Sequence, residues 1–273
     1  VIYSLSSYIG IQKGMAKISD WNVKLVIAFA IGVLLLGPTI FILNNTVQSF
    51  GLLLQNFMRM SLFTDSVQNS GFPGSWTVFY WLYWISYAPF TGIFIAKVSK
   101  GRTIRSVIIN TLVSGSAGCF LYFGILGSYS LHQQLHKVVD MVAMLNQGED
   151  TAAIIQMMRS LPLGAVFMII FCISSLLFLA TTLDGAAFTM ASTSTVGLKN
   201  NEEPSPMLRL FWCVMLSLVP LMMIFIKADL NTIKTCAFIT AVPIIFIMLV
   251  ILYGWLRWML KDYKERKVTL LDD

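Results

Sequence analysis

The sequence predicts an all-α polytopic membrane protein with about six full spans and the end of another. Hydrophobic residues make up 57% of the 273 residues and charged residues only 12%, which is about half the charged fraction of a typical soluble domain. The mean hydropathy is +0.76. The apolar residues also occur in uninterrupted runs, and ~20 such residues are enough to cross a bilayer as a helix. Composition and run length together exclude a soluble enzyme domain.

Each span is placed inside a stretch that contains no Asp, Glu, Lys or Arg. The first three stretches are Leu25–Met58, Ser66–Ala96 and Ser106–Leu131, and they predict spans at about 25–45, 75–97 and 106–128. The last three stretches are Ser160–Leu183, Leu210–Ile226 and Thr235–Leu256, and they predict spans at about 162–184, 208–227 and 233–258. Residues 1–12 are apolar from Val1 onward without a charged, signal-type start, so we expect the tail of a further span and a chain that lacks its beginning.

Lys and Arg gather on one side of the predicted spans, and this bias gives the orientation. The richer side, which is expected to face the cytoplasm, holds Lys13, Lys17, Lys24, Lys97, Lys100, Arg102, Arg105, Lys199, Arg209 and the basic run Arg257–Lys267. The other side holds Arg59, Lys137, Arg159, Lys227 and Lys234. The sides alternate correctly only if 48–68 does not cross. We therefore expect an outer interfacial helix there, with Asn56, Arg59 and Asp65 on its wet face.

The net charge of +6 is explained by this orientation and gives no reason to expect nucleic acid as a partner. The basic C-terminal run either orients the protein or also contacts anionic lipid. The four cysteines, Cys119, Cys172, Cys213 and Cys236, lie inside apolar spans without paired spacing. We expect them to pack as small hydrophobes. The polar segment 129–161 is expected to form an exposed amphipathic gate helix, because His132 and His136 lack a third ligand for zinc.

The most informative segment is 71–105, which carries an aromatic helix face. At about 100° per residue, the rings on that face are Trp76, Tyr80, Tyr83, Tyr87, Phe90 and Phe94, with Trp84 beside them. Aromatic faces attract cations by ~0.5–2 kcal/mol each, and aromatic cages recognise quaternary ammonium groups. Ordinary helix packing is the alternative. Pro89 and Gly92 interrupt the helix beyond the cluster, as helices near transporter binding sites are interrupted, so the combination favours a binding site.

This segment resembles the eighth span of the betaine/choline/carnitine transporter (BCCT) family. The matching residues are Trp76-Thr77-Val78-Phe79-Tyr80-Trp81, then Tyr83-Trp84, then the basic run Ser99-Lys100-Gly101-Arg102-Thr103-Ile104-Arg105. The resemblance covers essentially all of 1–273 and implies a twelve-span transporter with two inverted five-helix repeats of the leucine-transporter type. By this resemblance, 1–74 is the end of the first repeat, 75–258 is the second, and 259–273 is a cytoplasmic tail. A homotrimer in a bacterial-type inner membrane is also implied.

The resemblance assigns site residues as well. Tyr83, Trp84 and Tyr87 match positions of the substrate cage, and Trp76 matches an outer position on the access route. The family usually has Trp where Tyr83 stands, and this departure adds a hydroxyl that bears on the identity of the substrate.

A second set of residues matches the family's sodium sites. Phe178, Thr181 and Thr182 fit the pattern Phe-x-x-Thr-Ser with a final Thr, and Phe90 matches a position in a second sodium site. Two adjacent hydroxyls offer the oxygen that a hard cation prefers, although such hydroxyls also commonly bond back to their own helix. Sodium-independent exchangers of the family carry an Arg where Asn22 stands here, with Lys24 two residues on. Asp184 is equally consistent with placement at the cytoplasmic membrane boundary and with a role in gating.

The sequence therefore predicts a sodium-coupled secondary transporter rather than an enzyme. The expected substrate is a quaternary ammonium compound, with glycine betaine preferred over choline or carnitine, and sodium is the coupling ion with no other cofactor. Membrane lipid is the other expected partner. Two alternatives stay open, namely a sodium-independent carnitine-type exchanger and a non-transporting membrane sensor or membrane enzyme.

Overall fold

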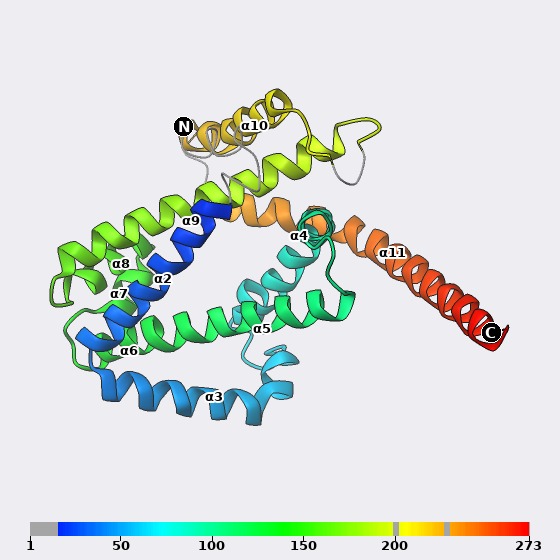
Figure 1. The fold of residues 1–273 in the computed structure, drawn as a ribbon. Coiled ribbons are helices and arrows are strands. Elements are labelled where there is room, and N and C mark those ends of the chain that lie inside the picture. Colours follow the sequence, from blue (N-terminus) through cyan, green and yellow to red (C-terminus); the bar gives the residue numbers. More distant parts are fainter. Residues whose placement is uncertain (1–15, 199–201, 227–229, 273) are drawn as a thin grey trace. The chain divides into compact units, whose positions relative to one another are not determined.

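A computed structural model describes residues 16–198, 202–226 and 230–272, and every regular element in these ranges is a helix (Figure 1). The expected tail of a further span at 1–12 lies outside the described residues. Six described helices are long and apolar enough to cross a membrane, namely Ala16–Leu36, Gly74–Val98, Ile104–Leu135, Gly164–Thr193, Pro206–Met223 and Ile239–Tyr263. The predicted all-helical class with about six spans is thus confirmed.

The chain divides into two compact units, and each is described by itself. The larger unit comprises Val1–Met58 with Ser99–Val219, and the smaller unit comprises Arg59–Val98 with Pro220–Asp273. This division follows contacts between helices, whereas the predicted division at 74/75 follows repeat symmetry. The repeat boundaries therefore stay a prediction.

The larger unit begins with α2 (Ala16–Leu36) and α3 (Thr39–Ser61). The helix break at Gly37 and Pro38 falls inside the span expected at 25–45, so that span runs earlier, over Ala16–Leu36. Pro38 has no backbone N–H to continue the helical hydrogen bonds, and the Thr39 hydroxyl donates to the carbonyl of Leu34 at 2.7 Å. The absence of charge continues straight through this break, which is why charge alone misplaced the span.

A long helical run follows in the larger unit, formed by α5 (Ile104–Tyr122), the π-helical turn η3 (Phe123–Gly127) and α6 (Ser128–Leu135). The Thr103 hydroxyl caps its start by accepting from the Ser106 amide at 3.2 Å. Helix α3 packs along this run, with the rings of Phe50 and Phe120 at 5.3 Å, and Figure 1 shows the two side by side. The interfacial helix that we expected at 48–68 corresponds to the second half of α3, which ends at Ser61.

The segment 129–161, which we expected on the outer side as a single exposed helix, is built differently. It forms the end of α6, then α7 (Met141–Asn146) and α8 (Asp150–Arg159), and it leads into α9 (Gly164–Thr193). Its apolar side chains help to build the main core, which comprises Phe29, Ala30, Val33, Ile42, Ile125, Tyr129, Val139, Met141, Ala153, Met157, Met158, Leu161 and Phe167. Tyr129 is 2% exposed and its hydroxyl lies 2.8 Å from that of Ser160. The segment therefore packs onto the larger unit as part of its core.

The smaller unit contains the π-helical turn η2 (Gly74–Val78), α4 (Phe79–Val98) and α11 (Leu230–Asp272), and α4 packs against α11. Pro89 leaves a carbonyl in α4 without its usual donor, yet the helix continues to Val98. Hydroxyls on either side of Pro89 support the backbone, because Ser86 donates to the Tyr83 carbonyl at 2.8 Å and Thr91 to the Tyr87 carbonyl at 3.0 Å. The remaining helix, α10 (Pro206–Phe225), contains Pro220.

Candidate functional site

The predicted substrate residues form one continuous series of ring contacts along η2 and α4. Trp76 and Tyr80 are nearly parallel, with centroids 6.2 Å apart and planes at 21°. Tyr83 and Tyr87 stack in the same way at 6.3 Å and 11°. Trp84 meets Tyr83 edge-on at 6.2 Å and 81°. The four predicted residues, Trp76, Tyr83, Trp84 and Tyr87, therefore belong to a single aromatic surface, which we call the ring series.

Two further rings complete the ring series, and the sequence did not assign them to the site. Phe79 lies 5.3 Å from Tyr80 and 5.9 Å from Tyr83, so it joins the two stacks. Phe72 lies 6.5 Å from Trp76 and extends the series outward. Both stand four residues before a predicted ring, and residues four apart are neighbours on a helix. This four-residue spacing is the sequence feature that could have assigned Phe72 and Phe79 to the ring series.

The ring series is open rather than packed away. Tyr83 is 43% exposed, Trp76 54% and Trp84 60%. Rings that only fill a helix interface lose most of their accessible surface, whereas these three keep about half of theirs. An exposed series of π faces inside a membrane span can attract a cation whose methyl groups offer no hydrogen bonds.

The start of the ring series is a π-helical turn, which a uniform helical spacing does not predict. In η2 the backbone bonds run from residue i to i+5, so Trp76 is rotated relative to its place in a regular α-helix. Single π turns occur frequently at functional sites. Tyr87 continues inward to Phe90 at 5.4 Å. The role of Phe90 in a second sodium site stays a prediction.

Of the predicted sodium residues, Phe178, Thr181 and Thr182 lie on α9 in the larger unit, and the two threonine hydroxyls bond to one atom. Thr181 and Thr182 each donate to the carbonyl oxygen of Phe178 at 2.9 Å. Back-bonding to the helix, which the sequence offered as the alternative, is thus present. It does not use up the oxygens, because a hydroxyl that donates its proton keeps two acceptor lone pairs. Both hydroxyl oxygens therefore keep lone pairs, and their binding of sodium stays a prediction.

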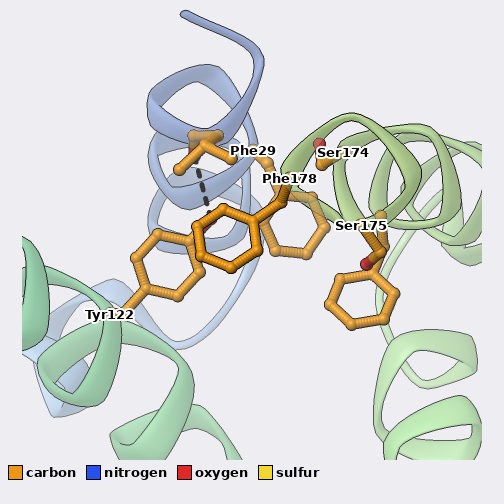
Figure 2. Close-up of a pocket in the computed structure, with 7 residues that line it drawn as sticks. Phe29, Tyr122, Ser174, Ser175 and Phe178 are labelled. Carbon is orange, nitrogen blue, oxygen red and sulfur yellow. Dashed lines mark hydrogen bonds between the residues drawn. The ribbon is translucent and has the colours of Figure 1, made fainter. Parts of the chain in front are cut away.

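Phe178 also forms part of a pocket of about 390 Å³ in the larger unit (Figure 2). The pocket lies between α2, α5 and α9 and is lined by Val26, Phe29, Tyr122, Phe171, Ser174, Ser175 and Phe178. The Tyr122 hydroxyl donates to the Val26 carbonyl at 3.5 Å, which is the dashed line in Figure 2. Aromatic and aliphatic side chains dominate the walls. The side-chain hydroxyls in its lining are those of Tyr122, Ser174 and Ser175.

The position where the resemblance expects the arginine of sodium-independent exchangers lies on α2. Asn22 is 5% exposed, and its Oδ1 has no hydrogen-bond partner among the described residues. Lys24 is exposed, and its Nζ lies 5.7 Å over the ring of Trp21. The buried position thus holds a neutral amide, whereas the charged side chain is held on an outer face.

Asp184 lies about 20 residues into α9, which is roughly the length that crosses a bilayer. It is 2% exposed, and the helix continues to Thr193. A carboxylate at a membrane boundary normally reaches water. Asp184 is nevertheless buried inside the larger unit, and both its placement at the membrane boundary and its role in gating stay predictions.

The comparisons with known proteins agree with this geometry. A family model described as betaine/carnitine/choline family transporter (BCCT) matches residues 1–264. The chain is 46% identical over 100% of its length to a carnitine transporter of Acinetobacter baumannii, of which it covers 50%. It is 40% identical over 97% of its length to the uncharacterized transporter YeaV of Escherichia coli, covering 55% of that protein. It is 30% identical over 93% of its length to a glycine betaine transporter of Acinetobacter baylyi, covering 38% of that protein.

Six apolar helices and an exposed series of aromatic rings, together with these matches, define a multi-pass membrane protein of a bacterial transporter class and not an enzyme. The chain belongs to the betaine/carnitine/choline transporter family. It spans about half the length of the first two relatives it matches. The resemblance seen at 76–105 is thereby confirmed.

Proposed function

We propose that the full-length protein containing this chain is a secondary transporter that moves quaternary ammonium compounds by alternating access. The observation that carries the proposal is the exposed ring series with Tyr83, Trp84 and Tyr87 at its inner part. A trimethylammonium group placed against these rings would gain cation–π attraction while losing little hydration. Trp76 and Tyr80 would offer rings nearer the start of the span.

The substrate is proposed from chemistry and from the relatives together. The sequence favoured glycine betaine, but the carnitine transporter is 46% identical to this chain and the glycine betaine transporter is 30% identical. Carnitine therefore becomes the first substrate to test. The Tyr83 phenol can donate a hydrogen bond to a carboxylate or a hydroxyl, and carnitine offers both.

Sodium coupling is supported by the threonine pair and by Asn22. Thr181 and Thr182 present adjacent hydroxyl oxygens. The buried Asn22 is neutral, so no protein cation at that position takes the place of sodium. Inward movement of one sodium ion gains ~2.3 kcal/mol per 100 mV of membrane potential, which can drive accumulation of the solute. The cytoplasmic C-terminus and the homotrimer are parts of the same proposal.

Uptake into proteoliposomes tests this function directly. Full-length protein would be given radiolabelled carnitine, glycine betaine or choline, with an inward sodium gradient or with potassium in place of sodium. Sodium-dependent accumulation is the expected result. Equal uptake in potassium, with faster uptake into vesicles preloaded with carnitine, would establish the exchanger instead. Binding without uptake would establish the sensor.

A further inference from the structure

The turn between α3 and the ring series is held by a buried carboxylate. Asp65 is 7% exposed, although ionisable side chains usually reach water. Its backbone is left-handed at φ 52, and Asn69 and Gly71 follow at φ 51 and φ 77. Left-handed backbone is unfavourable for a residue with a Cβ. Such a conformation persists when surrounding contacts over-determine it.

Those contacts converge on Ser70. The Asp65 Oδ2 accepts the Ser70 amide at 2.7 Å and also accepts the Ser70 hydroxyl. The Asn69 amide donates to the Asp65 carbonyl at 3.1 Å, which closes the turn. Bonds to an ionised carboxylate are roughly twice as strong as those between neutral groups. The Asp65 charge therefore fixes both the backbone and the side chain of Ser70.

Ser70 passes this constraint to the start of the ring series. Its hydroxyl oxygen accepts the Phe72 amide at 3.3 Å, and the Phe72 ring lies 6.5 Å from that of Trp76. The Ser75 amide donates to the Gly71 carbonyl at 3.0 Å immediately before the π-helical turn. A short series of contacts thus runs from the carboxylate to the outermost indole, entirely within the smaller unit.

We infer that Asp65 is a positioning residue for substrate recognition, which acts through Ser70 to set the place of Trp76 in the ring series. The inference rests on the proposed function, because it concerns affinity for the quaternary ammonium solute. Asp65 touches no solute itself. Its effect is on how the outer rings are presented, so it alters the capture of solute more than the later transport steps.

The test compares variants of the full-length protein. Asp65→Ala and Ser70→Ala each remove one end of the hydrogen-bonded link. Asp65→Asn keeps an acceptor oxygen without the charge, and Ser70→Thr keeps a hydroxyl. Asp140→Ala is the matched control, because Asp140 caps α7 by accepting the Ala143 amide at 3.1 Å and lies outside the ring series. Carnitine KM and kcat are measured for each. In parallel, fluorine NMR of fluorotryptophan-labelled protein follows Trp76, assigned with Trp76→Phe.

Asp65→Ala and Ser70→Ala should raise KM by about tenfold, which corresponds to ~1.4 kcal/mol, with kcat within about twofold of wild type. Both should move the Trp76 resonance. Ser70→Thr should restore wild-type values, Asp65→Asn should be intermediate, and Asp140→Ala should change neither readout. An unmoved Trp76 resonance, or an unchanged KM, would overturn the inference. If the wild type transports no quaternary ammonium compound, the proposed function fails, and the Trp76 resonance still decides the positioning role.

Discussion

The hydroxyl of Thr46 lies 3.0 Å from the carbonyl oxygen of Gly124, where α3 crosses the π-helical turn η3. The same hydroxyl lies 2.7 Å from the Ile42 carbonyl in its own helix. The side-chain amide of Asn45, the residue before Thr46, donates to the Ser128 hydroxyl at 2.9 Å. A π turn departs from the regular α-helical pattern of backbone bonds, and here the Thr46 side chain of α3 reaches a carbonyl within it. Helix α3 is therefore fixed to the span beside it.

Gly124→Ala should destabilise the larger unit. A Cβ at Gly124 would lie 2.7 Å from the Thr46 Cγ2, so the Thr46 side chain or one of the two helices must shift, at a cost of about 1–3 kcal/mol. Thermal unfolding of the detergent-solubilised protein measures the effect. Gly118→Ala is the matched control on α5, because a Cβ there meets nothing within 4 Å. Equal melting temperatures for the two variants would contradict the close packing at η3.

Trp84→Leu should weaken binding of carnitine by about tenfold, because it removes an exposed π face worth up to ~2 kcal/mol toward a desolvated cation. Trp81→Leu serves as the control. Trp81 is on the same helix and 65% exposed, but it makes no ring contact that places it in the ring series. Isothermal titration with full-length protein compares the two. Similar affinities for both variants would remove the ring series from the binding site.

Thr181→Val and Thr182→Val should each raise the half-saturating sodium concentration for uptake by about tenfold, because each loses one oxygen of the pair while keeping its shape. Thr193→Val is the control, since Thr193 bonds back to the Thr189 carbonyl at 3.0 Å on the same helix without belonging to the pair. Uptake at varied sodium concentration provides the measurement. A response equal to that of Thr193→Val would show that the hydroxyls act only on the helix.

Acid should disrupt the Asp65 turn only at low pH. Hydrogen bonds from the Ser70 hydroxyl and amide lower the pKa of Asp65 below its ordinary value of 3.8. Since the folded pKa is the lower one, the stabilisation is fully present above pH 3.8 and is lost as pH falls through the folded pKa. The Trp76 fluorine resonance should thus stay constant between about pH 8 and pH 4 and move only below that range. Asp65→Asn should abolish the movement.

The sequence predicted the spanning helices best where charge and periodicity agree. The segment expected at 75–97 is Gly74–Val98, because charge-free length and aromatic spacing both end at the same place. Helix α2 was misplaced because Lys17, Asp20 and Lys24 lie inside its first turns, while Pro38 ends it within a charge-free run. Charge reports the boundary of the bilayer, and a helix ends where its backbone bonds end.

The sequence predicted which rings lie on one helix face but not how they contact one another, and their role in binding stays a prediction. Trp76, Tyr83, Trp84 and Tyr87 do lie in one ring series, whereas the bridging role of Phe79 depends on the actual turn of the backbone. Asp65 was placed on the wet face of an interfacial helix, yet α3 ends at Ser61 and Asp65 caps a turn. A single Asp in a sequence does not show whether it lies on the wet face of a helix or in a turn. Left-handed backbone and π turns depend on local hydrogen bonds, and the periodicity of the sequence does not report these bonds.

The shared acceptor at Phe178 has a genetic consequence. Thr181 and Thr182 both donate to one carbonyl oxygen, so removal of either hydroxyl changes the surroundings of the bond that the other makes. Substitutions at neighbouring positions with a common partner are not independent. The two positions should therefore show epistasis: a chain that has lost one hydroxyl will tolerate or reject loss of the second differently from an intact chain. Natural variation at 181 and 182 should accordingly be correlated across the family.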